Sequence, residues 1–338
     1  MTQLEQADSA NIFIEGRTFD VPEKQAIGLA YPGVSIHFTA AAEKLFMRAY
    51  SSSDQQYIDV LRNGERVRKV QLQQGLHSTL LWDSAEDRTK AASFEIVRAS
   101  APWQGTLELV GIELVNGAIL KAKEAPTRKL LFIGDSITSG SVSDPLTIDE
   151  PKNLQSNNGR FSYGKLTARE LDAQAHLVSY GGRGLIRDWE GKDNSQTNNA
   201  PVFYPRAHPD DSQRLWDHNQ YQADAVVINL GTNDFNQGIP DSDTFVSAYV
   251  TFARQIRSDY PSAHIFLMLS PMHGVNSSER KALDSFITKT IQQLGDANIS
   301  KLDVSYYPGR NIDPHPVKEE HQAMADEIAP VIARTLGW

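Results

Sequence analysis

The sequence predicts two domains: an N-terminal β-sandwich, roughly of jelly-roll type, followed by a three-layer α/β/α domain built on a parallel sheet. Three observations support this fold class. A chain of 338 residues is long for a single domain. Residues 11–123 consist of short runs of alternating apolar and polar residues, which is the period of half-buried strands. In residues 129–338, apolar runs alternate with segments of helical period, which indicates βαβ units.

The first half contains the signals of short antiparallel strands. Apolar and polar residues alternate from Val34 to Thr39, which predicts a strand with one buried face. Asn63-Gly64 follows a later run, and this dipeptide favours the type I′ turn of a two-residue hairpin. A second Asn-Gly pair, at 116–117, marks another expected turn. The run before it changes its apolar phase near Gly111, which indicates a bulge.

Two interpretations of the tryptophans in this half stay open. A β-sandwich can bind carbohydrate, with Trp82 or Trp103 as a flat surface on which a sugar ring stacks. A single tryptophan in such a domain more commonly belongs to the core. Polar residues 121–128 then join this half to the next.

The second half is expected to contain five parallel strands. Helical spacing at 245–256 and 283–294 predicts two of the helices between them, and a last helix is expected to begin at Pro316 and to bend at Pro330. Two polar stretches, Ser141–Arg160 and Gly191–Ser212, fit neither period and are expected to wall a polar cleft, because long loops in compact domains are usually functional. The strands are expected at 130–133, 176–180, 225–230, 265–270 and about 299–304.

The strand at 130–133 is followed directly by Gly134-Asp135-Ser136. Ligands of open α/β sheets bind outside the carboxyl ends of the strands, so Ser136 lies where a nucleophile would lie. Asp135 and Ser136 are also residue types that cap a following helix. This segment alone does not decide between a nucleophile and a helix cap.

Polar residues at three other points of the same sheet edge favour the nucleophile. Acyl transfer requires a hydroxyl, a base within hydrogen-bond reach and donors aimed at the developing oxyanion. Ser136 supplies the hydroxyl, His315 the base, and Asp313 a carboxylate that can orient the imidazole. The expected oxyanion donors are the N–H groups of Ser136 and Gly184 and the side-chain amide of Asn233. The segments concerned are Gly181-Gly182-Arg183-Gly184, Gly231-Thr232-Asn233-Asp234 and Asp313-Pro314-His315-Pro316.

With Gly134-Asp135-Ser136, these segments resemble the four blocks of the SGNH (GDSL) hydrolase superfamily, whose serine, glycine, asparagine and histidine fall on Ser136, Gly184, Asn233 and His315. The preceding β-sandwich, Trp216-Asp217 and the closing Asp-x-His-Pro make the chain similar to carbohydrate esterase family 2, the acetyl xylan esterase-like enzymes, from about Gly16 onward. The resemblance implies a jelly-roll domain before an SGNH domain. It also implies removal of acetyl groups from polysaccharides such as xylan or mannan, without a metal or other cofactor.

The spacing of the acid and the base departs from the usual superfamily pattern. Most SGNH enzymes place the aspartate three residues before the histidine, whereas Asp313 lies two residues before His315 and Ile312 occupies the usual position. Family 2 esterases share the shorter spacing, and in some of them the carboxylate is not the orienting group. A triad with Asp313 and a dyad oriented by a backbone carbonyl therefore stay open. Pro314 stands where that family often has an aromatic residue, so a stacking contact is not expected there.

Composition restricts the partners of this protein. A formal net charge of −9 argues against nucleic acid and anionic membrane surfaces, and no apolar run is long enough to cross a bilayer. The absence of cysteine excludes disulfides, a thiolate nucleophile and Cys-ligated zinc. The first ten residues lack the pattern of a signal peptide. The family resemblance implies a secreted or periplasmic protein, and a cytoplasmic one is the alternative.

The sequence thus predicts a serine esterase that removes O-acetyl groups from a carbohydrate through an acetyl-enzyme intermediate. Trp189 and Asp135 are expected to contact the substrate, Trp189 by stacking on a sugar ring; the alternative for Trp189 is a helix residue packed in the core. Two other functions are weighed against this one. They are an SGNH esterase or lipase acting on other acyl esters, and a carbohydrate-binding protein with an inactive hydrolase half.

Overall fold

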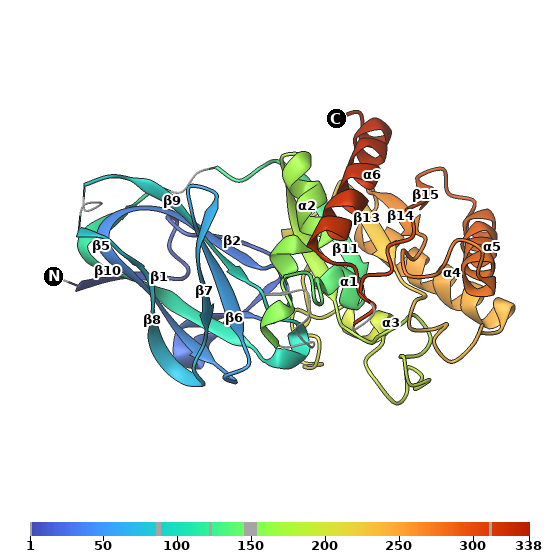
Figure 1. Ribbon diagram of the computed structural model, residues 1–338, viewed down its shortest axis with the longest axis horizontal. Helices are drawn as coiled ribbons and strands as arrows, with labels where there is room; N and C mark the ends of the chain where they lie inside the picture. Colours follow the sequence, from blue (N-terminus) through green and yellow to red (C-terminus); the bar gives the residue numbers. More distant parts are fainter. Residues whose placement is uncertain (1, 86–88, 122–123, 145–153, 311–312) are drawn as a thin grey trace.

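The computed structural model describes residues 2–85, 89–121, 124–144, 154–310 and 313–338. An antiparallel sheet, sheet A, occupies the N-terminal half, and a parallel sheet, sheet B, occupies the C-terminal half beside it (Figure 1). The expected domain end at residue 123, residues 145–153 of the first polar loop, and Ile312 lie outside the described residues.

Within the described residues, sheet A contains ten strands, and every pairing among them is antiparallel. It begins before the expected boundary at residue 11, because the first strand pairs with the last. The strands are β1 Thr2–Gln6, β2 Phe13–Glu15, β3 Thr18–Val21, β4 Ala26–Leu29, β5 Ser35–Ser51, β6 Tyr57–Arg62, β7 Glu65–Gln71, β8 Gly75–Asp83, β9 Ala92–Arg98 and β10 Leu107–Leu120.

Strand β5 organises sheet A. Its first residues pair with β2 and β9, and its last residues pair with β8, while β10 runs along most of its length. Its side chains alternate between buried and half-buried, so that Phe38, Leu45 and Met47 lie in the core. The alternation predicted from Val34 to Thr39 is therefore the start of a strand of 17 residues.

The turn predictions in this half have mixed outcomes. The hairpin at Asn63-Gly64 is confirmed: it joins β6 to β7, and both residues have a positive φ, as a type I′ turn requires. The bulge near Gly111 is confirmed by a register shift against β5. The turn at Asn116-Gly117 is wrong, because β10 continues through it to Leu120. A Cβ on Gly117 would lie 2.2 Å from the carbonyl oxygen of Ala41, so glycine permits a close approach of two strands there.

Sheet B confirms the predicted five-stranded parallel sheet, and each strand lies within a few residues of its expected position. The strand order β12-β11-β13-β14-β15 puts β11, which leads to Ser136, between two neighbours. Its strands are β11 Arg128–Gly134, β12 Ala173–Ser179, β13 Ala225–Asn229, β14 His264–Met268 and β15 Ile299–Leu302.

Helices cover sheet B, with α2 packed against α6 and α4 packed against α5. The last helix, α6, begins at Lys318 rather than at Pro316, because the side chain of Glu320 accepts the N–H of Val317 and caps the helix there. Pro330 lies inside α6. The helices are α1 Ser136–Ser139, α2 Tyr163–Glu170, α3 Ala200–Phe203, α4 Ser242–Asp259, α5 Ser278–Leu294 and α6 Lys318–Leu336, and the 3₁₀ turns are η1 Pro22–Lys24, η3 Pro102–Gln104, η4 Leu154–Ser156, η5 Gly159–Phe161 and η6 His218–Gln220.

The uninterrupted apolar run of β11 follows from burial on both faces of sheet B. Leu130 and Phe132 belong to the cluster that contains residues of α2 and α6. Leu131 and Ile133 belong to the cluster that contains residues of α4 and α5. A strand covered on both faces needs apolar residues at every position, whereas a half-buried strand alternates.

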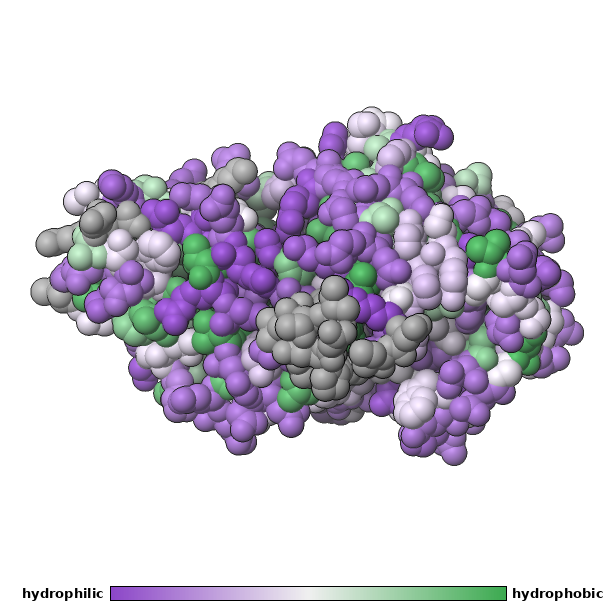
Figure 2. All heavy atoms as spheres, viewed as in Figure 1, coloured by the Kyte–Doolittle hydropathy of each residue, from purple (hydrophilic) through white to green (hydrophobic). Residues whose placement is uncertain are grey.

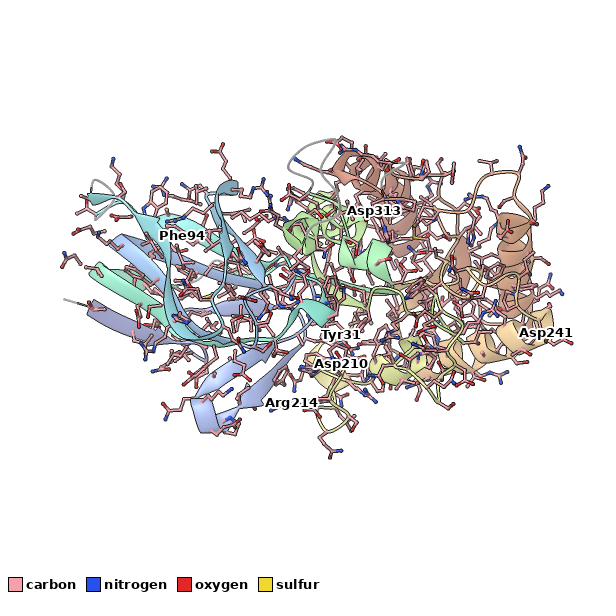
Figure 3. All side chains as sticks on the ribbon, turned by 60° about the horizontal axis from the view of Figure 1, so that its bottom comes forward. Tyr31, Phe94, Asp210, Arg214, Asp241 and Asp313 are labelled. Carbon is pink, nitrogen blue, oxygen red and sulfur yellow. The ribbon has the colours of Figure 1, made fainter. Side chains whose placement is uncertain are left out.

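One hydrophobic cluster runs through both halves of the chain, from residues of sheet A to residues packed against one face of sheet B. The buried guanidinium of Arg17, from sheet A, donates to the backbone carbonyls of Tyr204 and Arg206. The Tyr31 hydroxyl donates to the carbonyl of Phe203 at 3.0 Å, and Figure 3 shows Tyr31 at the junction of the halves. Each half is therefore held in a fixed position against the other.

The described helices include none that is long and apolar enough to cross a membrane. The face of the molecule in Figure 2 is mostly hydrophilic, with apolar side chains scattered over it.

Candidate active site

Ser136 lies at the point where β11 ends and α1 begins. The turn is tight: a Cβ on Gly134 would lie 2.1 Å from the hydroxyl oxygen of Thr138. The Asp135 side chain accepts the N–H of Ile137 at 2.9 Å and caps α1. The cap and the candidate nucleophile are thus different residues of the same motif, and the Ser136 hydroxyl is left to face the pocket.

His315 joins Ser136 to Asp313. Its Nε2 lies 2.9 Å from Ser136 Oγ, and its Nδ1 lies 2.5 Å from Asp313 Oδ1. The N–H of His315 also donates to the backbone carbonyl of Asp313 at 2.8 Å. A bond between residues two apart is that of an inverse γ-turn, and the fixed φ of Pro314 suits its central position. The short Asp-x-His spacing thus brings the Asp313 carboxylate into contact with the imidazole of His315, as a triad would require.

Gly309 supports this turn from behind. A Cβ there would lie 1.9 Å from the carbonyl oxygen of His315, and Gly309 has a φ of +72°. Any other residue would strain its own backbone and push His315 away from Ser136. We did not expect this role from the sequence, where Pro308-Gly309 indicates an ordinary turn.

Ser136 and His315 line a pocket of about 530 Å³. Both polar and apolar residues line the pocket. Its other lining residues are Trp103, Ser141, Gly181, Gly182, Trp189, Thr232, Asn233, Asn236, Met272 and Pro314.

Backbone donors face the pocket beside the serine. The N–H of Ser136 is the first of its helix and has no intrahelical partner. Gly181 lies close by, since a Cβ built on it would be 3.6 Å from Ser136 Cβ, and among the described residues none accepts its N–H. Gly184, the expected donor, is buried and is not among the residues that line the pocket, and its N–H donates to Asn199 Oδ1 at 3.3 Å. Gly181 takes its place as the candidate oxyanion donor.

Asn233 reaches the pocket but its amide is engaged. Nδ2 donates to Asp135 Oδ2 at 3.0 Å and to the carbonyl of Arg183 at 2.9 Å. These two bonds tie the segments that follow β11, β12 and β13 to one another. An oxyanion in the pocket would compete with the Arg183 carbonyl for one of the two amide hydrogens.

Two buried carboxyl groups, those of Asp135 and Asp234, lie beneath the pocket wall and bond to the segments that form it. Burial raises the pKa of Asp135 to about 7, and the nearby Asp234 adds to the rise. Burial also raises the pKa of Asp234, against the effect of the N–H groups of residues 185–187 that it accepts. Asp135 is fully buried and is not among the residues that line the pocket. It caps α1 and holds Asn233 instead.

Two tryptophans line the pocket from opposite halves of the chain. Trp189 is 52% exposed and lies outside any helix, so its interpretation as a packed helix residue is wrong. Trp103 is 45% exposed and comes from the sheet A half. The core interpretation is therefore wrong for Trp103, whereas Trp82 is half-buried and packs against the core near Phe94. The position of Trp103 beside Ser136 was not predicted from the sequence, because the residues around Trp103 in the pocket come from distant parts of the chain.

The expected polar walls contribute partly. Ser141 lines the catalytic pocket, and Lys192, Gln196 and Thr197 of the second stretch line a neighbouring one. Within the described ranges, no group of three or more His, Asp or Glu side chains is placed to hold a metal ion.

Comparison with known proteins places this site in a family. A model of the GDSL-like lipase/acylhydrolase family matches residues 132–333, which include Ser136, Asn233 and His315. The chain belongs to this family. The resemblance to SGNH (GDSL) hydrolases is confirmed, and with it the SGNH fold around sheet B.

The proteins similar to this GDSL-family protein include carbohydrate esterases. It is 36% identical over 336 residues to an acetylxylan esterase / glucomannan deacetylase from Cellvibrio japonicus, which covers 98% of this chain and 91% of that protein. A solved family two carbohydrate esterase from Cellvibrio japonicus superposes with a TM-score of 0.94 at 35% identity, covering 100% of this chain and 99% of that one. One from Clostridium thermocellum, in complex with cellohexaose, has a TM-score of 0.88 at 26% identity and covers 97% and 99%. The resemblance to carbohydrate esterase family 2 is confirmed.

Proposed function

We propose that this protein is a serine esterase that removes O-acetyl groups from carbohydrate. One observation carries the proposal: Ser136 Oγ, His315 and Asp313 are joined by contacts of 2.9 and 2.5 Å at the wall of an open pocket. The names of the relatives, acetylxylan esterase and glucomannan deacetylase, support acetylated polysaccharide as the substrate.

In the first step Ser136 Oγ attacks the acetyl carbonyl carbon while His315 Nε2 takes the hydroxyl proton. The carboxylate of Asp313 stabilises the imidazolium that forms. The electron pair of the carbonyl moves to its oxygen, which the N–H groups of Ser136 and Gly181 stabilise. When the intermediate collapses, the bond to the sugar oxygen breaks and His315 returns its proton to that oxygen. The sugar leaves with a free hydroxyl, and the acetyl group stays on Ser136.

In the second step His315 takes a proton from water, and the hydroxide oxygen attacks the acetyl-enzyme. The same two backbone donors hold the second oxyanion. The Ser136 Oγ–carbon bond then breaks, the proton on His315 returns to Oγ, and acetic acid leaves and ionises. The cycle consumes one water and requires no group that the chain lacks.

Asn233 is proposed as the third oxyanion donor. Without moving, its Nδ2 hydrogen that is bonded to the Arg183 carbonyl would be shared with the oxyanion, because an ionised acceptor binds about twice as strongly as a neutral one. The other hydrogen stays on Asp135, which fixes the plane of the amide. Because the amide is already held in place, little free energy is spent on orienting this donor during the reaction.

Trp189 is proposed to stack on the sugar ring that carries the acetyl group. Its backbone is immobilised: its N–H donates to the Gly182 carbonyl, and its own carbonyl accepts from the side chains of Asn236 and Gln237. An exposed indole on a fixed backbone presents an apolar face to a ring without a large entropy cost.

Two broader proposals follow from a polysaccharide substrate. We propose that the protein acts outside the cytoplasm, because a polysaccharide substrate would be found there. We also propose that sheet A is a jelly-roll-like sandwich that forms one wall of the substrate cleft; its support is the pairing of β5 with β2 and β9 at one end and with β8 at the other.

Acetate release from acetylated xylan and acetylated glucomannan tests the proposed reaction. The wild type should release acetate from at least one of the two, and Ser136→Ala should release none above background. Esters of longer acids should be poorer substrates than acetate esters. Activity that persists in Ser136→Ala, or that rises with acyl-chain length, would count against the proposal.

A further inference from the structure

A second pocket, of about 480 Å³, lies beside the catalytic one. The two pockets share Trp103, Gly181 and Trp189, so the tryptophans stand at their boundary. The side chains found only in the second pocket are polar or charged: Tyr180, Arg183, Asp188, Glu190, Lys192, Gln196 and Thr197. The esterase chemistry uses none of them.

Trp103 is held at this boundary by a dedicated set of buried groups. It lies in η3, and the fully buried guanidinium of Arg98 donates to the carbonyls of Ser100, Ala101 and Gly105 on either side of that turn. Burial of a guanidinium is costly unless hydrogen bonds compensate it. Here those bonds fix the backbone that presents the indole.

Gln104, next to Trp103, fixes the same turn to the other half of the chain. Its side chain is buried and accepts from the N–H of Ala101 and from Asn157 Nδ2, both at 2.9 Å. Its Nε2 donates to the carbonyls of Gln55 and Leu154. Leu154 and Asn157 precede α2, so this turn of the sheet A half is fixed against the half that carries Ser136. An immobile turn with an exposed indole is a surface suited to a ligand.

The second pocket carries no excess charge. Arg183 pairs with Asp188 at 3.2 Å, and Lys192 pairs with Glu190. Hydroxyl, amide, ammonium and carboxylate groups thus offer donors and acceptors in a balanced set. Such a lining suits the hydroxyl groups of a neutral sugar, whereas a site for an anion would leave positive charge unpaired.

We propose that Trp103 and the second pocket form a binding subsite for the sugar residue next to the acetylated one. The inference rests on the proposed function. The acetylated ring lies in the catalytic pocket, the chain crosses between Trp103 and Trp189, and the neighbouring ring packs its C–H face on Trp103 with its hydroxyl groups toward Lys192 and Thr197. The sheet A half is then part of the substrate-binding surface, and the enzyme prefers oligosaccharides to acetylated single sugars.

Trp103→Ala and Trp103→Phe test the subsite, with steady-state kinetics on an acetylated xylo-oligosaccharide, an acetylated methyl xyloside and p-nitrophenyl acetate. The ratio of kcat/KM for the oligosaccharide to kcat/KM for p-nitrophenyl acetate should fall about tenfold in Trp103→Ala, through KM, which corresponds to about 1.4 kcal/mol. Trp103→Phe should recover most of the ratio because it keeps an aromatic face. The preference for the oligosaccharide over the methyl xyloside should shrink in parallel.

Lys192→Met tests the pocket independently of the tryptophan and should raise KM for the oligosaccharide more than for the methyl xyloside. Tyr306→Ala is the matched control: Tyr306 is 40% exposed, lines neither pocket and should leave every ratio unchanged. Equal losses on all three esters in Trp103→Ala and Trp103→Phe would assign Trp103 to folding alone and overturn the inference. So would an unchanged oligosaccharide ratio in Trp103→Ala and Lys192→Met.

The outcome separates the inference from the function on which it rests. A wild type that hydrolyses p-nitrophenyl acetate but releases no acetate from any acetylated sugar contradicts the proposed substrate, and the inference with it. A wild type that deacetylates single sugars and oligosaccharides equally well keeps the proposed function and contradicts only the subsite.

Discussion

Replacement of Asp313 by asparagine tests how His315 is held. The change keeps the size of the side chain but removes the charge that lies 2.5 Å from His315 Nδ1. Opposite charges at that distance attract by about 6.6 kcal/mol at an effective dielectric constant of about 20, which is an upper limit for what the imidazolium loses. A triad aspartate replaced by asparagine lowers kcat by about 10⁴, or about 5.4 kcal/mol, which lies just under that limit. We therefore expect a loss of about 10⁴ in kcat for Asp313→Asn.

The assay is hydrolysis of p-nitrophenyl acetate. The variant is used only if its thermal unfolding midpoint, Tm, equals that of the wild type, which shows that it is folded. Asp303→Asn is a matched control, because Asp303 is an exposed carboxylate in the same half of the chain, paired with Lys301, and should change kcat by less than about twofold. His315→Ala should lose about as much as Asp313→Asn or more, since the two residues act as a unit. A loss below about tenfold for Asp313→Asn would refute the triad and leave a serine–histidine dyad.

Three other predictions test the site and its support. Gly309→Ala should lower kcat at least about 10²-fold, because its methyl group would displace the His315 backbone; activity within threefold of wild type, in folded protein, would contradict this. Asn233→Ala should lower kcat by about 10²–10³ with a smaller effect on KM, as loss of an oxyanion donor does; a change in KM alone would remove it from the oxyanion hole. Burial, with the positive charges of Arg17 and Lys165 nearby, holds the pKa of His176 in the folded protein well below its usual value. Below pH 6.5 this histidine therefore binds a proton in the unfolded chain but not in the folded protein. Stability is therefore lost as the pH falls, and denaturant unfolding should show His176→Phe gaining about 2 kcal/mol on wild type between pH 6.5 and pH 5; parallel pH dependences would refute this assignment.

The sequence was informative where one physical requirement acts on consecutive residues. The strands of sheet B are buried on both faces, so Leu130 to Ile133 had to be apolar throughout and were recognisable as a buried strand. Parallel strands bring their carboxyl ends to one edge, so Ser136, Asn233 and His315 could be expected near one another before any contact was known. The structure brings these side chains to one pocket.

The rest depends on contacts between residues far apart in the chain. The segment Gly181-Gly182-Arg183-Gly184 contains several backbone N–H groups that could serve as the oxyanion donor. The sequence does not show that the N–H of Gly184 already donates to Asn199, because that contact forms only in the fold. Trp103 lies beside Ser136 because Arg98 and Gln104 fix its turn against the other half, and no local pattern records such docking. Asn116-Gly117 has the composition of a hairpin turn, but the pairing of β10 with β5 on both sides of it keeps the strand continuous.

Labelling with a p-nitrophenyl phosphonate shows directly whether Ser136 is the nucleophile of an esterase. We expect release of one equivalent of p-nitrophenol per mole of protein, a phosphonyl adduct on the peptide that contains Ser136, and loss of acetyl esterase activity in proportion to the adduct. Ser136→Ala should release none. Full inactivation without an adduct on Ser136, or a stoichiometric adduct on Ser136 that leaves the activity intact, would show that Ser136 is not the nucleophile.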